Sequence, residues 1–215
     1  MTTIEIDKPL ETSRAKRLKA ATNETHDRLD TSIMAVEPFA SRDRYALFLT
    51  VQHQFHRDID VLYRNPALDK LLPDLAGRRR FGLIEQDLID LGIVPAISGV
   101  AEFGSDTDVD VPTALGWLYV AEGSNLGAAF LLKEAARLGL SETFGARHLA
   151  AAPEGRGLHW KTFTSALDGL QLTETEEDRV ISGARAAFAR VQALVKELLL
   201  PQTTNLSAAA TLVAQ

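Results

Sequence analysis

A long apolar stretch in the middle of the chain contains two glycines four residues apart, Gly123 and Gly127. Each glycine in a helix interior costs roughly 0.8–1.0 kcal/mol relative to alanine, so the pair weakens a helix by about 2 kcal/mol. A helix tolerates such a loss where its backbone must bend, or where another group must approach the backbone closely. The pair therefore predicts a helix whose backbone contacts either a second helix or a flat ligand.

Apolar residues recur at helical spacing along most of the chain, without an internal repeat or a convincing alternation of period two. Ser13 and Ser41 are candidate N-caps, Gly139 is a candidate C-terminal stop, and Thr173 with Glu176 forms a capping box. The pattern predicts helices over these ranges: about 14–34, 42–63, 78–91, 113–138, 158–168 and 174–199, with a short helix after Pro66.

The chain is expected to form one all-α domain over residues 14–200. Residues 1–13 are predicted to be an N-terminal extension, and residues 201–215 a C-terminal tail. Residues 93–112, rich in Gly, Pro and polar residues, are predicted to be a loop, and residues 141–157, which hold several Gly and Pro residues, a loop with short helical turns.

Composition narrows the function classes. The chain has 215 residues, 46% of them hydrophobic and 24% charged, which is ordinary for a globular domain with a sizeable core. A net charge of −6 argues against nucleic acid as the main partner. The absence of cysteine excludes disulfides, thiolate metal ligands and a thiol nucleophile. Neither a signal-peptide pattern nor an apolar run long enough to span a membrane is present, so a cytoplasmic protein without membrane association is predicted.

Five histidines are the candidate metal ligands: His26, His53, His56, His148 and His159. His26 shares a helix face with Lys19, although a single helix histidine is more often a core or surface residue. His53 and His56 are spaced to converge on a metal, but further ligands are missing and no Glu-x-x-His motif supports a di-iron site. His148 and His159 are interpreted as structural or surface residues.

The segment Leu18–Leu29 holds His26, and about ninety residues later Glu122–Leu131 holds the glycine pair. Shorter runs of the same kind lie at Phe39–Asp43, Leu62–Asn65, Phe144–Leu149 and Gly183–Phe188. Together they resemble the bacterial heme oxygenases over residues 14 to 198. The resemblance implies a single-domain, multi-helix fold with heme sandwiched between a proximal and a distal helix.

By this resemblance, His26 is the axial ligand of the heme iron. Its imidazole must be neutral, and its second ring nitrogen needs a hydrogen-bond acceptor that fixes the tautomer. Glu24 and Asp27 are both near in sequence, and the sequence does not choose between them. Gly123 and Gly127 match the distal helix, where small residues let the backbone approach the oxygen pocket.

The resemblance also assigns the distal polar groups. Asn125, Arg80 and His56 match positions that hold ordered, proton-delivering water in bacterial relatives, and the alternative is that His56 and Arg80 are ordinary helix-surface residues. Ser124 stands where the mammalian enzymes carry an aspartate, so proton delivery here cannot depend on that carboxylate.

Lys19, Tyr119 and Arg185 match positions that bind the heme propionates in relatives that cleave at the α-meso carbon. The alternative for each is a solvated surface residue. Trp117 and Phe130 are expected to be core residues, although either could line the pocket.

The implied activity is cleavage of heme, which is both cofactor and substrate, to biliverdin (the α isomer), carbon monoxide and ferrous iron, with molecular oxygen as co-substrate. Electrons must come from an external ferredoxin or reductase-type donor, because no flavin, nicotinamide or cluster motif is present. The run Arg78–Arg80 is expected to send one arginine inward and to offer the others to an acidic donor. A bacteriophytochrome is a candidate biliverdin acceptor. A non-catalytic heme carrier or sensor, and a helical protein without a cofactor, are the alternatives.

Overall fold

The computed structural model describes residues 13–95, 99–104 and 109–200, so the predicted extension and tail lie almost entirely outside the described residues. Within those ranges the chain is helical, and no strand forms beyond isolated bridges at Ser141. The α-helices are α1 Arg14–Ala35, α2 Arg42–Ile59, α3 Pro66–Asp69, α4 Phe81–Asp90, α5 Val111–Ala136, α6 Arg156–Gly169 and α7 Glu174–Leu198. Three short 3₁₀ helices are η1 Leu62–Arg64, η2 Ala76–Arg78 and η3 Arg147–Leu149. The all-α prediction is confirmed.

The predicted helix ends were mostly correct because local side chains determine them. The hydroxyls of Ser13 and Ser41 each accept a backbone N–H at 3.2 Å, from Lys16 and Arg44. The capping box of Thr173 and Glu176 is present at the start of α7. Gly139 follows α5 with a φ of +73°, the left-handed conformation that favours glycine.

Several helix ends differ from the prediction. α5 ends at Ala136 and α6 begins at Arg156, each two residues earlier than expected. Three further ends differ for reasons that the structure shows. α2 ends at Ile59, because Asn65 is extended before Pro66 and the intervening chain forms the turn η1. α4 begins at Phe81 rather than at 78, since η2 and an extended Arg79 precede it. α5 begins at Val111, because the Asp110 carboxylate accepts the N–H of Thr113 at 3.1 Å, an N-cap that the sequence analysis missed.

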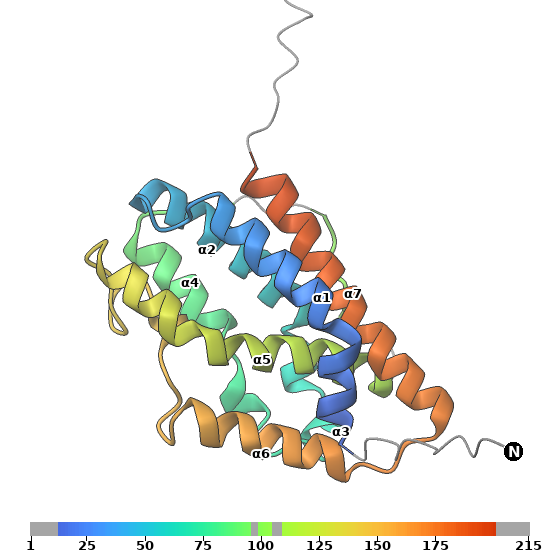
Figure 1. The fold of residues 1–215 in the computed structure, drawn as a ribbon. Coiled ribbons are helices and arrows are strands. Elements are labelled where there is room, and N and C mark those ends of the chain that lie inside the picture. The colour runs from blue at the N-terminus through green and yellow to red at the C-terminus, as the bar shows by residue number, and fades with distance from the viewer. Residues whose placement is uncertain (1–12, 96–98, 105–108, 201–215) are drawn as a thin grey trace, which may run out of the picture.

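α5 runs across the middle of the molecule (Figure 1). α6 packs along one side of it, α2 packs against α4, and α1 lies beside α7. The core is built from large side chains of several helices, among them Tyr45, Phe48, Leu118, Phe163 and Leu194. Trp117 is also buried, as predicted, and its ring stacks on Phe55 with the centroids 6.0 Å apart. Within the described part of the chain, no helix is long and apolar enough to cross a membrane.

Glycine brings two helices into backbone contact, but not at the predicted pair. A Cβ on Gly116 of α5 would overlap the carbonyl oxygen of Val180, and one on Gly183 of α7 would overlap that of Thr113. A Cβ on Gly127, in contrast, would meet nothing within 4 Å. Close helix packing therefore explains Gly116 and Gly183, and Gly127 requires a different explanation.

Candidate active site

His26 projects from α1 with 55% of its side chain exposed. Its ring lies edge-on to Phe188 of α7, with the ring centroids 5.9 Å apart. Its Nδ1 lies 3.4 Å from Asp30 Oδ2 and 3.8 Å from Asp27 Oδ1. Asp30, which the sequence analysis did not consider, is thus the nearer carboxylate, and its i,i+4 spacing from His26 was the signal that could have found it.

One face of α5 is apolar and exposed. It comprises Gly123, Leu126, Gly127 and Phe130, which recur at the spacing of one helix face and which we call the open face of α5. Leu126 is 44% exposed and Phe130 is 53% exposed, so the prediction that Phe130 is a core residue was wrong. Phe130 is exposed because it lies on the same face as the two glycines. Apolar side chains gathered on a bare backbone form a surface suited to a flat apolar partner.

A group of buried polar side chains lies around the start of α4 and the turn η3. Arg80 donates to the carbonyl oxygens of His148 and Ala150 at 2.8 and 2.9 Å. His148 Nδ1 lies 2.8 Å from Asp87 Oδ2. Burial, together with the nearby charges of His148 and Arg80, lowers the pKa of His56 to about 3. The surface alternative for His56 and Arg80 was wrong, because both side chains are buried.

Several of these polar atoms are left without a hydrogen-bond partner among the described residues. They are His56 Nδ1, Asn125 Nδ2 and His148 Nε2. Buried polar atoms are almost always hydrogen-bonded to protein or to ordered water, so these three indicate where water binds. Ser124, in contrast, is exposed, and its hydroxyl donates to the Ala121 carbonyl oxygen at 2.7 Å.

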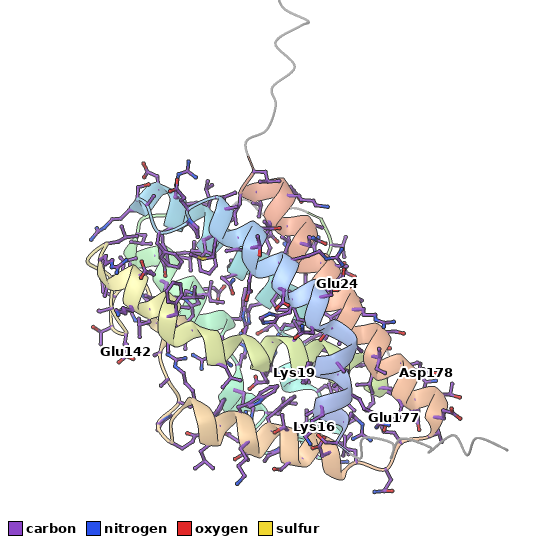
Figure 2. All side chains as sticks on the ribbon, in the orientation of Figure 1. Lys16, Lys19, Glu24, Glu142, Glu177 and Asp178 are labelled. Atoms are coloured by element: carbon purple, nitrogen blue, oxygen red, sulfur yellow. The ribbon has the colours of Figure 1, made fainter. Side chains whose placement is uncertain are left out.

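The three predicted propionate ligands come from three helices. Lys19 is exposed on α1 near its crossing with α5 (Figure 2), and Arg185 is exposed on α7. Tyr119 of α5 is nearly buried, and its hydroxyl donates to the Ala15 carbonyl oxygen at 3.4 Å. Burial raises the pKa of Tyr119, which therefore stays a protonated donor at neutral pH.

The run of three arginines does not form a docking surface. Arg78 and Arg80 are both buried, and Arg79 is one-third exposed and ion-paired with Asp60. The expectation that two of the three arginines face an acidic electron donor was wrong. Arg78 and Arg80 each belong to a different buried hydrogen-bond network. The sequence analysis also missed Glu122, the buried carboxylate that pairs with Arg78 at 2.9 Å.

The remaining histidines, His53, His148 and His159, are buried. His148 and His159 are buried and paired with acidic residues, in agreement with the prediction. His53 is buried against the Phe81 ring, with the centroids 5.1 Å apart. Among the described residues, no group of three or more His, Cys, Asp or Glu side chains is arranged to hold a metal ion.

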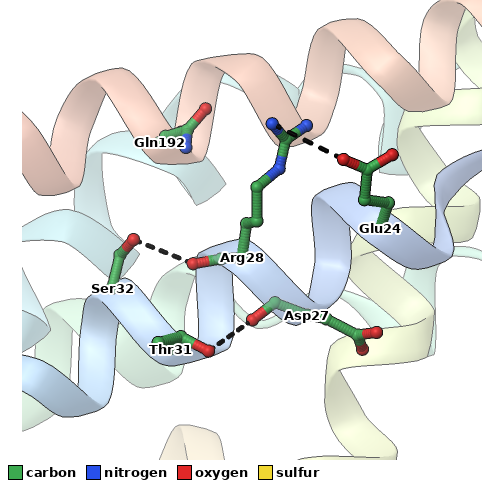
Figure 3. A pocket seen from close by; sticks show the side chains of 6 residues that line it. All are labelled: Glu24, Asp27, Arg28, Thr31, Ser32 and Gln192. Atoms are coloured by element: carbon green, nitrogen blue, oxygen red, sulfur yellow. Dashed lines mark hydrogen bonds and ion pairs between the residues drawn. The ribbon is translucent and has the colours of Figure 1, made fainter.

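A polar hollow of about 400 Å³ lies elsewhere, between α1 and α7 (Figure 3). Its lining residues are all polar or charged: Glu24, Asp27, Arg28, Thr31, Ser32 and Gln192. Glu24 and Asp27, the two candidate acceptors for His26 in the sequence analysis, line it, but none of the predicted iron-binding, propionate-binding or water-holding residues does. Since heme is largely apolar, the open face of α5 suits it better than this hollow does.

Comparisons with known proteins agree with the resemblance in sequence. The family model described as heme oxygenase matches residues 12–197. The chain is also 49% identical over 177 residues to heme oxygenase PigA of Pseudomonas aeruginosa, covering 82% of this chain and 88% of the relative. The chain belongs to the heme oxygenase family. It is therefore an enzyme of heme degradation, and it binds heme.

Solved heme oxygenases share the fold. The Neisseria meningitidis enzyme, solved with NO and CO bound, matches with a TM-score of 0.81 and 43% identity over 87% of this chain and 92% of that one. A Synechocystis heme oxygenase in complex with heme matches with a TM-score of 0.71 at 16% identity, over 86% of this chain and 92% of that one. The likeness to the Synechocystis enzyme supports the fold alone. Heme oxygenases as a family take electrons from reductase or ferredoxin donors.

Proposed function

We propose that the enzyme uses molecular oxygen and external electrons to cleave heme to α-biliverdin, carbon monoxide and ferrous iron, with the heme held between α1 and the open face of α5. The observation that carries this proposal is the pairing of an exposed imidazole on α1 with a bare, apolar glycine face on α5.

The residues present fit heme. Heme is a flat, largely apolar disc whose iron would take a nitrogen ligand from the protein. His26 offers a nitrogen to one side, and Gly127 leaves space for the disc on the other, because a Cβ there would meet no neighbour within 4 Å. Leu126 and Phe130 supply apolar contacts. Bound heme supplies the iron that activates oxygen and the porphyrin edge that is oxidised.

His26 is held in the orientation and tautomer that an axial ligand needs. Asp30 Oδ2 lies 3.4 Å from Nδ1 and would accept the Nδ1–H, which would leave Nε2 to bind iron. Phe188 packs against the ring edge and limits its rotation. We therefore assign Asp30, rather than Glu24 or Asp27, as the acceptor for His26.

The distal residues hold water rather than act directly as an acid. Gly123 and Gly127 present backbone, and the Ser124 hydroxyl is engaged with its own helix. His56 is neutral at physiological pH because its pKa is about 3, so it hydrogen-bonds water without carrying charge. His56, Arg80 and Asn125 would hold the water that delivers protons. Two observations support this role: His56 Nδ1 and Asn125 Nδ2 are buried without a partner among the described residues, and the Arg80 side chain is buried.

Lys19, Tyr119 and Arg185 would anchor the propionates, since two cations and one neutral hydroxyl donor suit two carboxylates. Anchoring sets which meso carbon faces the oxygen, and this arrangement supports the α isomer. The electron donor would be a ferredoxin or reductase, and a bacteriophytochrome remains a candidate biliverdin acceptor. The cytoplasmic location stays a prediction.

One reaction tests the proposal: heme, oxygen and a reductant are added to the protein and the visible spectrum is followed. Loss of the Soret band with growth of a biliverdin band in the red supports the proposed reaction. A stable oxygen complex without biliverdin would instead indicate a heme carrier or sensor. A titration without a sharp Soret band would contradict heme binding at this site.

A further inference from the structure

A single buried carboxylate lies directly before the first glycine of the open face. Glu122 is only 2% exposed, and side chains from three other elements meet it. The Tyr63 hydroxyl of η1 donates to Oε1 at 2.9 Å. Arg78 of η2 donates to Oε2 at 2.9 Å, and His159 Nε2 of α6 lies 3.5 Å from the same oxygen.

Arg78 ties this carboxylate to the surrounding chain. Its Nε donates to the Pro73 carbonyl oxygen at 3.0 Å, and both terminal nitrogens donate to the His159 carbonyl oxygen at 3.2 Å. Its guanidinium also lies over the Phe163 ring, 5.7 Å from the centroid. A buried ion pair contributes little net stability, but it fixes geometry because each partner is costly to leave unpaired. Arg78 therefore fixes η2 and α6 relative to Glu122.

α6 also contacts the turn of α5 from Gly123 to Gly127, which we call the glycine turn. Trp160, the residue after His159, lies 3.6 Å from the position that a Cβ on Gly123 would take. Its ring also packs against Tyr119 of α5, with the centroids 5.5 Å apart. The same α6 segment thus reaches Glu122 through His159 and reaches Gly123 through Trp160.

We propose that Glu122 is a positioning residue that fixes the rotation of α5 and so the orientation of its open face toward heme. The inference rests on the proposed heme site. The two glycines make the adjoining helix easy to bend, so a fixed point beside Gly123 determines where their backbone lies. Glu122 does not touch the heme in this arrangement; it acts through Gly123. Because displacements of about 1 Å alter catalysis strongly, holding this turn matters to the reaction.

The test compares Glu122→Gln with Glu177→Gln in the full chain. The amide introduced by Glu122→Gln would still accept from the Tyr63 hydroxyl, but it would leave the Arg78 charge unpaired. Glu177 is the control, because it forms a partly buried ion pair with Arg14 at 2.6 Å and a second with Arg17 at 2.9 Å, which link α7 to α1 without involving Glu122. Both substitutions are expected to lower the melting temperature.

Two measurements separate positioning from stability. In the heme-free protein, Glu122→Gln should speed amide hydrogen exchange over residues 123–130 by about tenfold or more, and Glu177→Gln should leave it unchanged. In the ferric heme complex, only Glu122→Gln should shift the pH midpoint of the acid-to-alkaline spectral transition. Tyr63→Phe, which removes one hydrogen bond and keeps the ion pair, should give the same shifts at smaller size, and it serves if Glu122→Gln does not fold.

Equal exchange rates and equal midpoints in Tyr63→Phe, Glu122→Gln and the Glu177 control would overturn the inference. Wild-type protein that binds no heme would overturn the proposed function and the inference with it. Faster exchange with an unchanged midpoint would overturn the inference alone, because the turn would then move without affecting the heme.

Discussion

His26 is more exposed than a structural histidine of a packed helix would be, and this makes its role easy to test. Its side chain contributes little to the core, so His26→Ala is expected to change the free energy of unfolding by less than about 0.5 kcal/mol. The variant should lose the histidine-ligated heme spectrum, and added imidazole should restore it. Retention of the histidine-ligated spectrum without imidazole would contradict the assignment of His26.

Lys19 is a second residue whose role can be isolated. If it anchors a propionate, Lys19→Ala should change the product from α-biliverdin to a mixture of isomers, because the heme can then rotate in its plane. Product chromatography measures this directly. Lys16→Ala is the control, since Lys16 is exposed on the same helix one turn earlier (Figure 2). An unchanged product from Lys19→Ala would contradict the assignment.

At the level of helices, two glycines in helix interiors, Gly183 of α7 and Gly127 of α5, should respond in opposite ways to substitution by alanine. Gly183→Ala would drive a Cβ into the Thr113 carbonyl oxygen and separate α7 from α5, so it should destabilise the protein by about 1–3 kcal/mol. Gly127→Ala meets open space and gains helix propensity, so it should leave stability unchanged or raise it by up to about 1 kcal/mol. Denaturant unfolding of both variants tests this.

Heme binding by the Gly127→Ala variant separates the effect of this glycine on ligand binding from its effect on stability. Gly127→Ala should weaken heme binding although it does not weaken the fold, because its methyl group occupies space proposed for the ligand. A variant that binds heme as tightly as the wild type would show that the open face of α5 is not the heme surface.

The stability of the contact between α6 and α5 should depend on pH, because His159 of α6 lies beside Glu122 of α5. The Glu122 carboxylate, 3.5 Å from Nε2, and a hydrogen bond to Glu154 at 2.7 Å raise the pKa of His159 above its usual 6.5, although burial opposes the shift. A raised pKa in the folded state means that the stabilisation is complete below about pH 6.5 and is lost as pH rises through the higher folded value. Wild-type protein should therefore be more stable than His159→Gln in mild acid, and the difference should shrink toward alkaline pH. A difference that grows with pH would contradict this.

For the molecule as a whole, the sequence predicted what neighbouring residues determine. The capping residues Ser13, Ser41 and Thr173 defined their helix starts, because each acts within one turn. The sequence could not predict the partners of Glu122, because Tyr63 and Arg78 are 59 and 44 residues away along the chain. The arginine run was misinterpreted for the same reason, because only the folded chain shows that Arg78 and Arg80 are buried and that Arg79 pairs with the buried Asp60.

The exposure of Phe130 and the contact between Gly116 and Gly183 also depend on how helices cross. Local sequence shows that a residue is apolar or small, but it does not show which helix face is covered. The family resemblance supplied part of what periodicity could not, because it predicts that Gly123, Gly127 and His26 belong to one site.

Heme binding should couple α1 to α5, which meet here through the Tyr119 hydroxyl and the Ala15 carbonyl oxygen. A ligand that binds only the folded protein stabilises it by about 2.7 kcal/mol at a free concentration of 100 times its dissociation constant. If the heme bridges the two helices, hemin should slow hydrogen exchange around His26 on α1 and over residues 123–131 of α5 together. If heme entered the polar hollow of Figure 3 instead, protection would appear around Arg28 on α1 and Gln192 on α7, and α5 would be unaffected. The exchange pattern therefore decides between the two sites without relying on catalytic activity.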